Sequence, residues 1–159
     1  MPEIKTNVMR LLEKEQIPYL AHEYPHGKDA VDGETVAALL GQDVQTVFKT
    51  LVTRGADQNI YVFVIPVNRE LDLKKAAKAA GVKSVAMLHV SELTKVTGYM
   101  RGGCSPIGMK KKYPTFFDES GKEQQRMIVS AGKIGYQIDL APEALAQVTG
   151  GNFAPLTVT

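Results

Sequence analysis

The sequence predicts a mixed α/β domain, in which a mostly antiparallel, curled, barrel-like sheet is surrounded by helices. Three observations lead to this prediction. Strand and helix patterns alternate irregularly along the chain. Two strand patterns, over residues 46–53 and 60–67, are joined by a short turn, which implies antiparallel neighbours. The second of them is almost wholly apolar, which is typical of a strand covered on both faces.

The elements before these two strands are short. Thr6 can cap a first helix, which ends at the Ile-Pro pair at 17–18. Residues 19–24 look extended. A second helix is expected over 34–40, and Gly41 suits its C-terminal cap.

After the two strands, capping residues define a third helix. Asp72 can cap its N-terminus and Gly81 can close its C-terminus. A strand over 82–88, a short helix over 91–96 and a glycine-rich loop over 97–108 are expected to follow.

The last third of the chain predicts three strands and a helix. The strands are expected at 115–117, 127–130 and 136–140. Pro142 suits the first turn of a final helix that ends near Gly150.

Composition limits the class of protein. The chain has 159 residues, 44% of them hydrophobic and 23% charged, which predicts one soluble globular domain over residues 1–159. The net charge of +2 excludes a strongly basic coat for nucleic acid. The single cysteine, Cys104, cannot form an internal disulfide and fits a reducing compartment. With neither a signal peptide nor a membrane span in the pattern, we expect a cytoplasmic protein without a structural metal.

Lys49 is unusual because it interrupts an apolar strand. Strand side chains alternate, so Lys49 shares a face with Val47 and Leu51, while Phe48, Thr50 and Val52 share the other. A buried ammonium without partners is expensive. Lys49 therefore either extends to the solvent edge or faces a polar cavity, where it could bind an anion or a carbonyl oxygen.

The loop over 97–108 contains four glycines. Gly102 and Gly103 permit positive φ and a close approach of ligand to backbone N–H groups, which could form an anion nest or an oxyanion hole. A tight structural turn would need the same residues. The loop lacks the lysine and the spacing of a Walker A motif.

Several short motifs occur in a characteristic order along the chain. They are FKTLV at 48–52, LDLKKAAK at 71–78, TGY at 97–99, GG at 102–103, SPIG at 105–108, VS at 129–130, GK at 132–133 and Gly135. This ordered set resembles the YbaK/EbsC family of aminoacyl-tRNA deacylases, close to the Cys-tRNA(Pro) deacylase branch, over nearly the whole chain.

The resemblance implies a fold related to the editing domain of some prolyl-tRNA synthetases. It also implies a trans-editing hydrolase that cleaves the ester bond of mischarged aminoacyl-tRNA, most simply Cys-tRNA(Pro), without metal or cofactor. The family lysine corresponds to Lys49, and the oxyanion-stabilising glycines correspond to Gly102 and Gly103. The implied substrate-binding residues are Tyr24, Thr97, Ser130 and Asp139, with His22 beside Tyr24 and Cys104 beside the glycines as further candidates. Without the resemblance, the alternatives are a half-buried strand aromatic for Tyr24, a surface histidine for His22, a strand-end hydroxyl for Ser130 and a helix-capping carboxylate for Asp139. In the cysteine-specific branch the thiol of the substrate is thought to attack the ester, so that the enzyme needs only to position it.

Three residues depart from the family pattern: Cys104, Ala131 and Ile134. These departures bear on which amino acid is removed from the tRNA more than on the reaction. They also motivate an alternative function, a binding module of the same fold that holds an aminoacyl-tRNA end or a regulatory partner without turnover. Cys104 itself is either a nucleophile, which would need a lowered thiol pKa, or a passive small side chain.

The remaining charged residues allow fewer conclusions. His22, His26 and His89 do not have the spacing of a metal site. Lys110, Lys111 and Lys112 form either a solvated turn or a phosphate contact for the tRNA acceptor end. Because the net charge is small, we expect weak tRNA binding, with prolyl-tRNA synthetase as a candidate partner that presents the substrate to a monomer or weak dimer.

Overall fold

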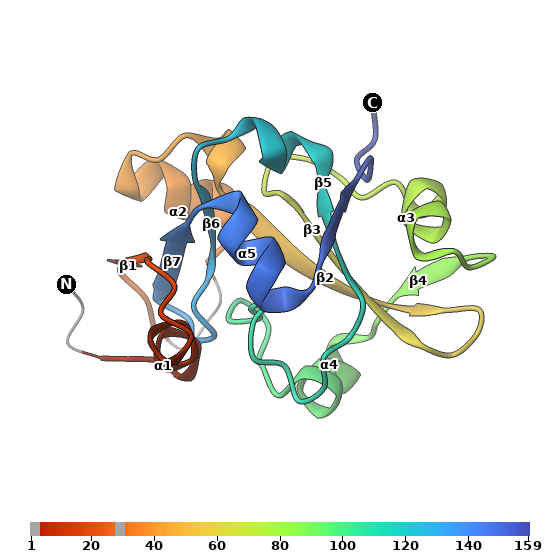
Figure 1. Cartoon of the computed structure of the whole chain (residues 1–159), viewed down its shortest axis with the longest axis horizontal. Helices are drawn as coiled ribbons and strands as arrows, with labels where there is room; N and C mark the ends of the chain where they lie inside the picture. The colour runs from red at the N-terminus through yellow and green to blue at the C-terminus, as the bar shows by residue number, and fades with distance from the viewer. Residues whose placement is uncertain (1–3, 28–30) are drawn as a thin grey trace.

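The computed structural model describes residues 4–27 and 31–159, and the strands of these residues form two sheets (Figure 1). One sheet has three strands in the order β1-β7-β6, and the other has five in the order β4-β2-β3-β5-β8. The strands are β1 (Leu20–Glu23), β2 (Phe48–Gly55), β3 (Ile60–Pro66), β4 (Val85–Met87), β5 (Thr115–Asp118), β6 (Met127–Ser130), β7 (Tyr136–Leu140) and β8 (Asn152–Ala154). The helices are α1 (Asn7–Lys14), α2 (Gly33–Leu40), α3 (Leu73–Ala80), α4 (Val90–Thr97) and α5 (Pro142–Thr149), with short 3₁₀ helices η1 (Val44–Thr46) and η2 (Glu119–Glu123).

The pairing confirms a mixed, mostly antiparallel arrangement. The smaller sheet is wholly antiparallel. In the larger sheet β2 pairs antiparallel with β3 and β4, whereas β5 runs parallel to both β3 and β8. A single parallel bridge between Val47 and Ile128 connects the two sheets. Closure into a barrel is not confirmed, because this bridge does not extend into a ladder.

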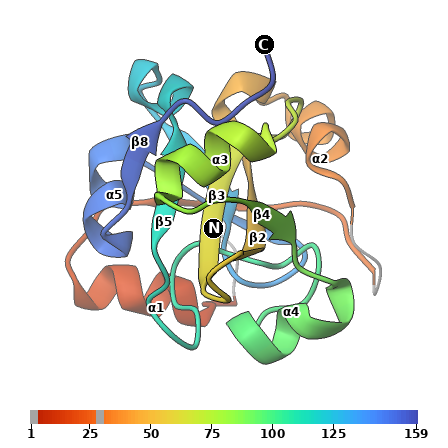
Figure 2. The ribbon, with the colours of Figure 1, turned by 90° about the vertical axis from the view of Figure 1, so that its right-hand side faces the viewer.

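The central strand β3 is covered on both faces, as its apolar run predicted. Tyr61, Phe63 and Ile65 pack in a cluster with residues of α3. Val62 and Val64 point the other way, into a core shared with α1, α5 and the smaller sheet. Figure 2 shows α3 lying across the larger sheet on one side. The antiparallel ladder between β2 and β3 then fixes the position of β2 beside this buried strand.

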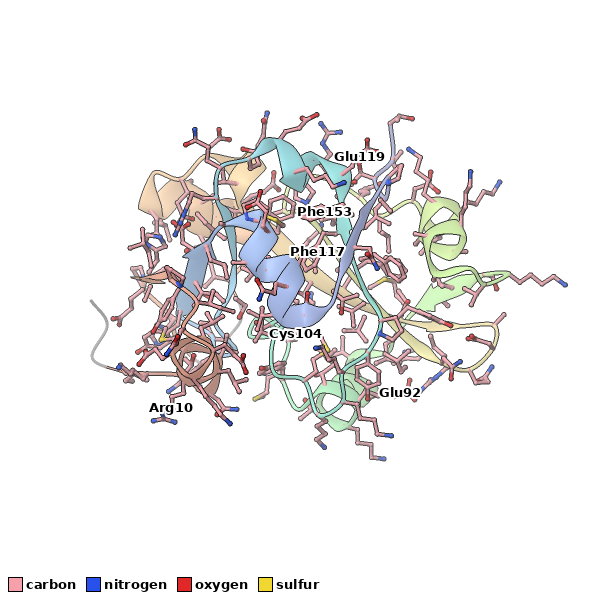
Figure 3. All side chains as sticks on the ribbon, in the orientation of Figure 1. Arg10, Glu92, Cys104, Phe117, Glu119 and Phe153 are labelled. Atoms are coloured by element: carbon pink, nitrogen blue, oxygen red, sulfur yellow. The ribbon has the colours of Figure 1, made fainter. Side chains whose placement is uncertain are left out.

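The C-terminal strand β8 was not predicted. It pairs with β5 so that Phe117 and Phe153 lie opposite each other, with ring centroids 5.5 Å apart (Figure 3). A three-residue strand that begins with Asn carries almost no local signal. Its pairing to β5, not its own propensity, makes it a strand.

The predicted helix caps are confirmed. The Met9 N–H donates to Thr6 Oγ1 at 3.2 Å, and the Lys74 and Lys75 N–H groups donate to Asp72 Oδ1 at 3.0 and 3.1 Å. Gly81 has φ +73°, the left-handed conformation that ends α3 and favours glycine.

Two predicted strands have different bounds. The strand expected over 46–53 begins at Phe48, because Asp43 caps a 3₁₀ turn in which the Gln45 N–H donates to Asp43 Oδ1 at 2.9 Å. It continues to Gly55, which pairs with Val85 of β4. The strand expected over 82–88 is shorter, because the Val82 N–H caps α3 through the Ala77 carbonyl at 3.0 Å.

None of the helices in residues 4–27 and 31–159 could cross a membrane. Each α-helix has eight residues, which corresponds to a length of about 12 Å.

Candidate active site

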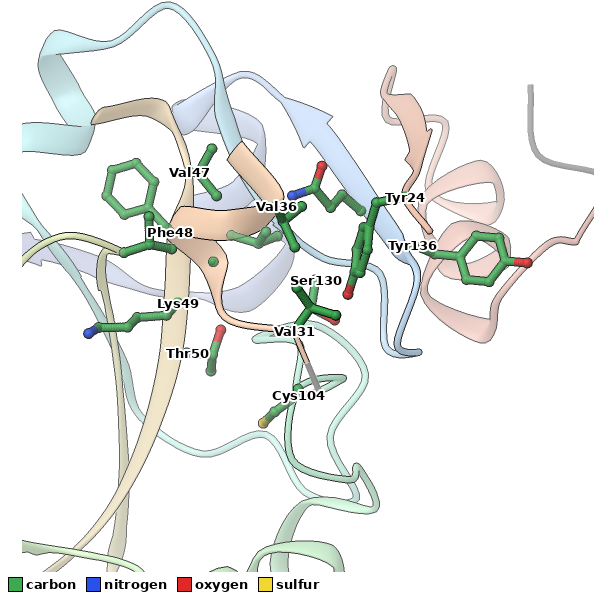
Figure 4. A pocket seen from close by; sticks show the side chains of 15 residues that line it. Tyr24, Val31, Val36, Val47, Phe48, Lys49, Thr50, Cys104, Ser130 and Tyr136 are labelled. Carbon is green, nitrogen blue, oxygen red and sulfur yellow. The ribbon is translucent and has the colours of Figure 1, made fainter. Parts of the chain in front are cut away.

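A cavity of about 160 Å³ lies between the two sheets, beside α2 and the glycine loop (Figure 4). Five of the predicted site residues line it: Tyr24, Lys49, Gly102, Cys104 and Ser130. The other lining residues are Val31, Gly33, Val36, Val47, Phe48, Thr50, Val67, Val129, Tyr136 and Gln137. Segments far apart in the chain therefore meet in one small, partly polar hollow.

Strand β2 contributes two polar side chains, Lys49 and Thr50. Lys49 is half-buried, and Figure 4 shows its ammonium directed away from Tyr24 and Ser130. Strand alternation explains this direction, since Thr50 is the neighbour that points toward Cys104. The Thr50 hydroxyl is buried and has no hydrogen-bond partner among the described residues. Thr50 was not predicted as a site residue, although it was the one polar residue expected on the face of Phe48 and Val52.

The smaller sheet contributes Tyr24 and Ser130, whose side chains point into the same hollow (Figure 4). The Tyr24 N–H donates to the Gly135 carbonyl at 2.9 Å, which continues the backbone pairing of β1 with β7 by one residue and holds the Tyr24 backbone in place. Ser130 Oγ accepts from the Gly132 N–H at 3.1 Å. That contact uses a lone pair, so the Ser130 hydroxyl proton is still available to a ligand.

The glycine loop forms a tight turn at its centre. The Gly103 N–H donates to the Met100 carbonyl at 2.9 Å, and Gly102 has φ +85°. This is the geometry of a type II turn, whose third residue favours glycine. The Gly103 N–H is therefore occupied, and Gly103 lies outside the cavity lining. Within the described residues, the N–H groups of Gly102 and Cys104 have no such partner.

The surroundings of Cys104 favour the protonated form of its thiol. Burial raises the pKa of the Cys104 thiol to about 12, and the Thr97 hydroxyl beside it lowers that pKa only in part. A nucleophilic cysteine needs the opposite shift. The raised pKa therefore favours a passive side chain in the cavity wall over a catalytic thiolate.

Sequence comparison identifies the protein family of this chain. A model of the aminoacyl-tRNA editing domain matches residues 27–148. The chain belongs to the aminoacyl-tRNA editing domain family. This editing domain is 52% identical over 153 residues to EbsC of Enterococcus faecalis, a protein provisionally named a Cys-tRNA(Pro)/Cys-tRNA(Cys) deacylase. The match covers 96% of this chain and 93% of EbsC.

A more distant relative and a solved structure are also similar to this chain. The proline–tRNA ligase of Shouchella clausii is 28% identical over 87% of this chain and 23% of the ligase. A crystal structure provisionally described as a trans-editing enzyme for prolyl-tRNA synthetase has a TM-score of 0.80 at 24% identity, covering 97% of this chain and 99% of that one. At that identity the likeness shows the fold.

In this editing domain, His22 and Asp139 lie together but away from the cavity lining. His22 Nε2 is 3.0 Å from Asp139 Oδ2, and the Arg126 Nε–H donates to Asp139 Oδ1 at 2.7 Å. Arg126 also donates to the Asp139 carbonyl. Both carboxylate oxygens of Asp139 are thus used within the protein, on the same face of the smaller sheet as Gln137.

Thr97 and the lysine triplet also lie outside the cavity lining of the editing domain. The Thr97 hydroxyl donates to the Leu93 carbonyl at 2.8 Å and accepts from the Tyr99 N–H at 3.0 Å, so it organises the start of the glycine loop. Lys110, Lys111 and Lys112 are exposed. The described residues of the editing domain contain no cluster of three or more His, Cys, Asp or Glu side chains that could hold a metal ion.

Proposed function

We propose that this chain is a trans-editing hydrolase that cleaves the ester bond of mischarged aminoacyl-tRNA, with Cys-tRNA(Pro) as the first substrate to test. The observation that carries the proposal is that Lys49, Tyr24, Ser130 and Gly102, from distant parts of the chain, line one cavity. The identity to EbsC over nearly the whole of both chains supports the choice of substrate.

The size of the cavity favours a small amino acid. An engineered protein cavity of about 150 Å³ admits benzene. The cavity here is about 160 Å³, so it can hold an aminoacyl group with a short side chain such as cysteine, but no nucleoside in addition. Its rim must therefore lie where the ester joins the amino acid to the terminal ribose.

The polar groups of the cavity suit an ester under attack. The N–H groups of Gly102 and Cys104 are the candidate oxyanion donors, since the Gly103 N–H is held by Met100. Ser130 and Thr50 can hydrogen-bond the amino or carbonyl group of the substrate. Lys49 sits on a flexible four-carbon stem, which allows its ammonium to turn toward the carbonyl or the ribose.

The protein need not supply a nucleophile. The thiol of a cysteinyl substrate can attack its own ester carbonyl. The S–C bond forms, the C–O bond to the ribose breaks, and the thiol proton ends on the ribose oxygen. The product is a cyclic thioester that water then opens. Holding the thiol close to the carbonyl supplies the rate enhancement.

The tRNA itself would be contacted outside the aminoacyl cavity. Lys110, Lys111 and Lys112 are candidate contacts for acceptor-end phosphates, and such contacts would weaken steeply with added salt. Because the net charge is only +2, presentation of the tRNA by prolyl-tRNA synthetase would help. The protein would act in the cytoplasm as a monomer or weak dimer.

Deacylation of a panel of mischarged tRNAs tests the proposal. Catalytic amounts of protein should release the amino acid from Cys-tRNA(Pro), and Lys49→Ala should lower the rate on the order of a hundredfold without unfolding the protein. Lys83→Ala, at an exposed position that follows α3 and does not line the cavity, is the matched control. Full turnover by Lys49→Ala would remove Lys49 from the site. Stoichiometric binding without ester cleavage would favour the binding-module alternative.

A further inference from the structure

A second cavity lies on the other side of the glycine loop. Its volume is about 410 Å³, within the range of ordinary ligand sites and more than twice that of the aminoacyl cavity. It is lined by His26, Gly27, Gly98, Tyr99, Met100, Gly103, Gly132, Lys133 and Ile134. Gly102 and Cys104 line the first cavity and Gly103 lines the second, so one stretch of backbone separates the two.

The two cavities are held in a fixed relation. A Cβ on Gly103 would lie 3.1 Å from the Ile134 nitrogen and 3.2 Å from Lys133 Cα, so the glycine loop packs directly on the turn after Ser130. The Tyr99 ring fills the space beside Gly132 and its hydroxyl donates to the Ile107 carbonyl. A ligand that crosses the glycine loop therefore meets two preformed hollows.

The second cavity has groups that recognise a nucleotide. Lys133 is exposed and lies over the Tyr136 ring at 5.8 Å, and no carboxylate of the described residues is within ion-pair distance of it. His26 Nδ1 is 3.0 Å from the Tyr24 carbonyl, which can only accept, so Nδ1–H donates there and Nε2 is left for a ligand. Met100 is 69% exposed and supplies apolar surface next to Tyr99.

Resting on the proposed function, we propose that this second cavity binds the terminal nucleotide of the aminoacyl-tRNA. Lys133 contacts its phosphate, and Tyr99, Met100 and His26 contact its base or ribose. The aminoacyl group then enters the smaller cavity across Gly102. The side chain of Lys110 lies over Gly98 at the edge of the second cavity, where it can meet the next phosphate of the strand.

Binding of 5′-AMP tests this inference without any ester cleavage. The chain has six methionines, so methyl-labelled methionine gives a short NMR spectrum. The Met100 methyl signal should shift saturably with 5′-AMP, whereas those of the buried Met9 and Met127 should not. Lys133→Ala should weaken 5′-AMP on the order of tenfold, and Lys133→Arg should restore it. Lys83→Ala should leave it unchanged.

Three outcomes would overturn the inference: no shift of Met100, the same affinity in Lys133→Ala, or an equal shift with inorganic phosphate alone. A kinetic measurement distinguishes failure of nucleotide binding in the second cavity from failure of the proposed deacylase function. Lys133→Ala should raise the KM for Cys-tRNA(Pro) and leave kcat unchanged. If deacylation persists without 5′-AMP binding, the inference fails while the proposed function stands. If 5′-AMP binds and no tRNA is deacylated, the proposed function fails while the cavity keeps its ligand.

Discussion

Thr50 makes the sharpest prediction, because its substitution should change stability and activity in opposite directions. Its hydroxyl is buried without a partner among the described residues, and a buried polar group of this kind costs about 1–3 kcal/mol. Thr50→Val keeps the shape and removes that cost. We expect the free energy of unfolding to rise by about 1 kcal/mol, which for a domain of this size raises Tm by about 2–4 °C.

The same substitution should impair the site. If Thr50 donates its hydrogen bond to the substrate, losing that bond costs about 1 kcal/mol or more in the transition state, and kcat/KM for Cys-tRNA(Pro) falls on the order of tenfold. The stability is measured by thermal and urea unfolding, and the activity by tRNA deacylation under conditions where both proteins are folded.

Thr53 on the same strand is the matched control. Its hydroxyl is fully buried and donates to the Tyr61 carbonyl at 2.9 Å. Thr53→Val should therefore lose about 1 kcal/mol of stability and leave turnover unchanged. A destabilised Thr50→Val variant, or one with full activity, would refute the assignment of Thr50 as a hydroxyl kept unpaired for the substrate.

Two further predictions concern Cys104 and Asp139. Cys104→Ala should retain turnover, and alkylation of native protein at neutral pH should be slow, because burial raises the pKa of the Cys104 thiol to about 12 from its ordinary value of 9.0. Between about pH 9 and pH 12 the folded state then keeps a proton that the unfolded state releases, so the free energy of unfolding should fall as pH rises. The fall should be less steep in Cys104→Ala. Equal pH slopes of the free energy of unfolding in the two proteins would count against a buried thiol. Asp139→Asn should lower stability by about 1–3 kcal/mol in urea unfolding, since it weakens the contacts to His22 and Arg126. A raised KM with unchanged stability would instead return Asp139 to substrate binding.

Local signals predicted much of the fold. Capping residues located the helices, as with Asp72 and Gly81 at the ends of α3. The apolar run of β3 correctly predicted burial on both faces. The division into two sheets could not be read in this way, because it depends on which distant strands pair. The antiparallel ladder between β1 and β7 joins residues more than a hundred positions apart.

The site was predictable by residue type more than by geometry. Lys49, Tyr24, Ser130 and Gly102 do meet in one cavity. Strand alternation separates Lys49 from Thr50, but which of the two faces the hollow depends on how β2 packs in the fold, and the hydrogen bond from Gly103 to Met100 depends on the closed turn. His22 and Asp139 are brought together by strand register, which explains why their mutual contact had no signal in the sequence.

The aminoacyl cavity takes its lining from both sheets, and this has a consequence for how the protein refolds. Tyr24 and Ser130 come from the smaller sheet and its edge, whereas Lys49 and Thr50 come from the larger sheet. The smaller sheet forms only when β1, near the N-terminus, pairs with β7, near the C-terminus. Pairings at such sequence separation form late, because the loop that they close is long. Recovery of deacylation after dilution from urea should therefore track the slowest step of folding, and neither half of the gene should encode a fragment with residual activity.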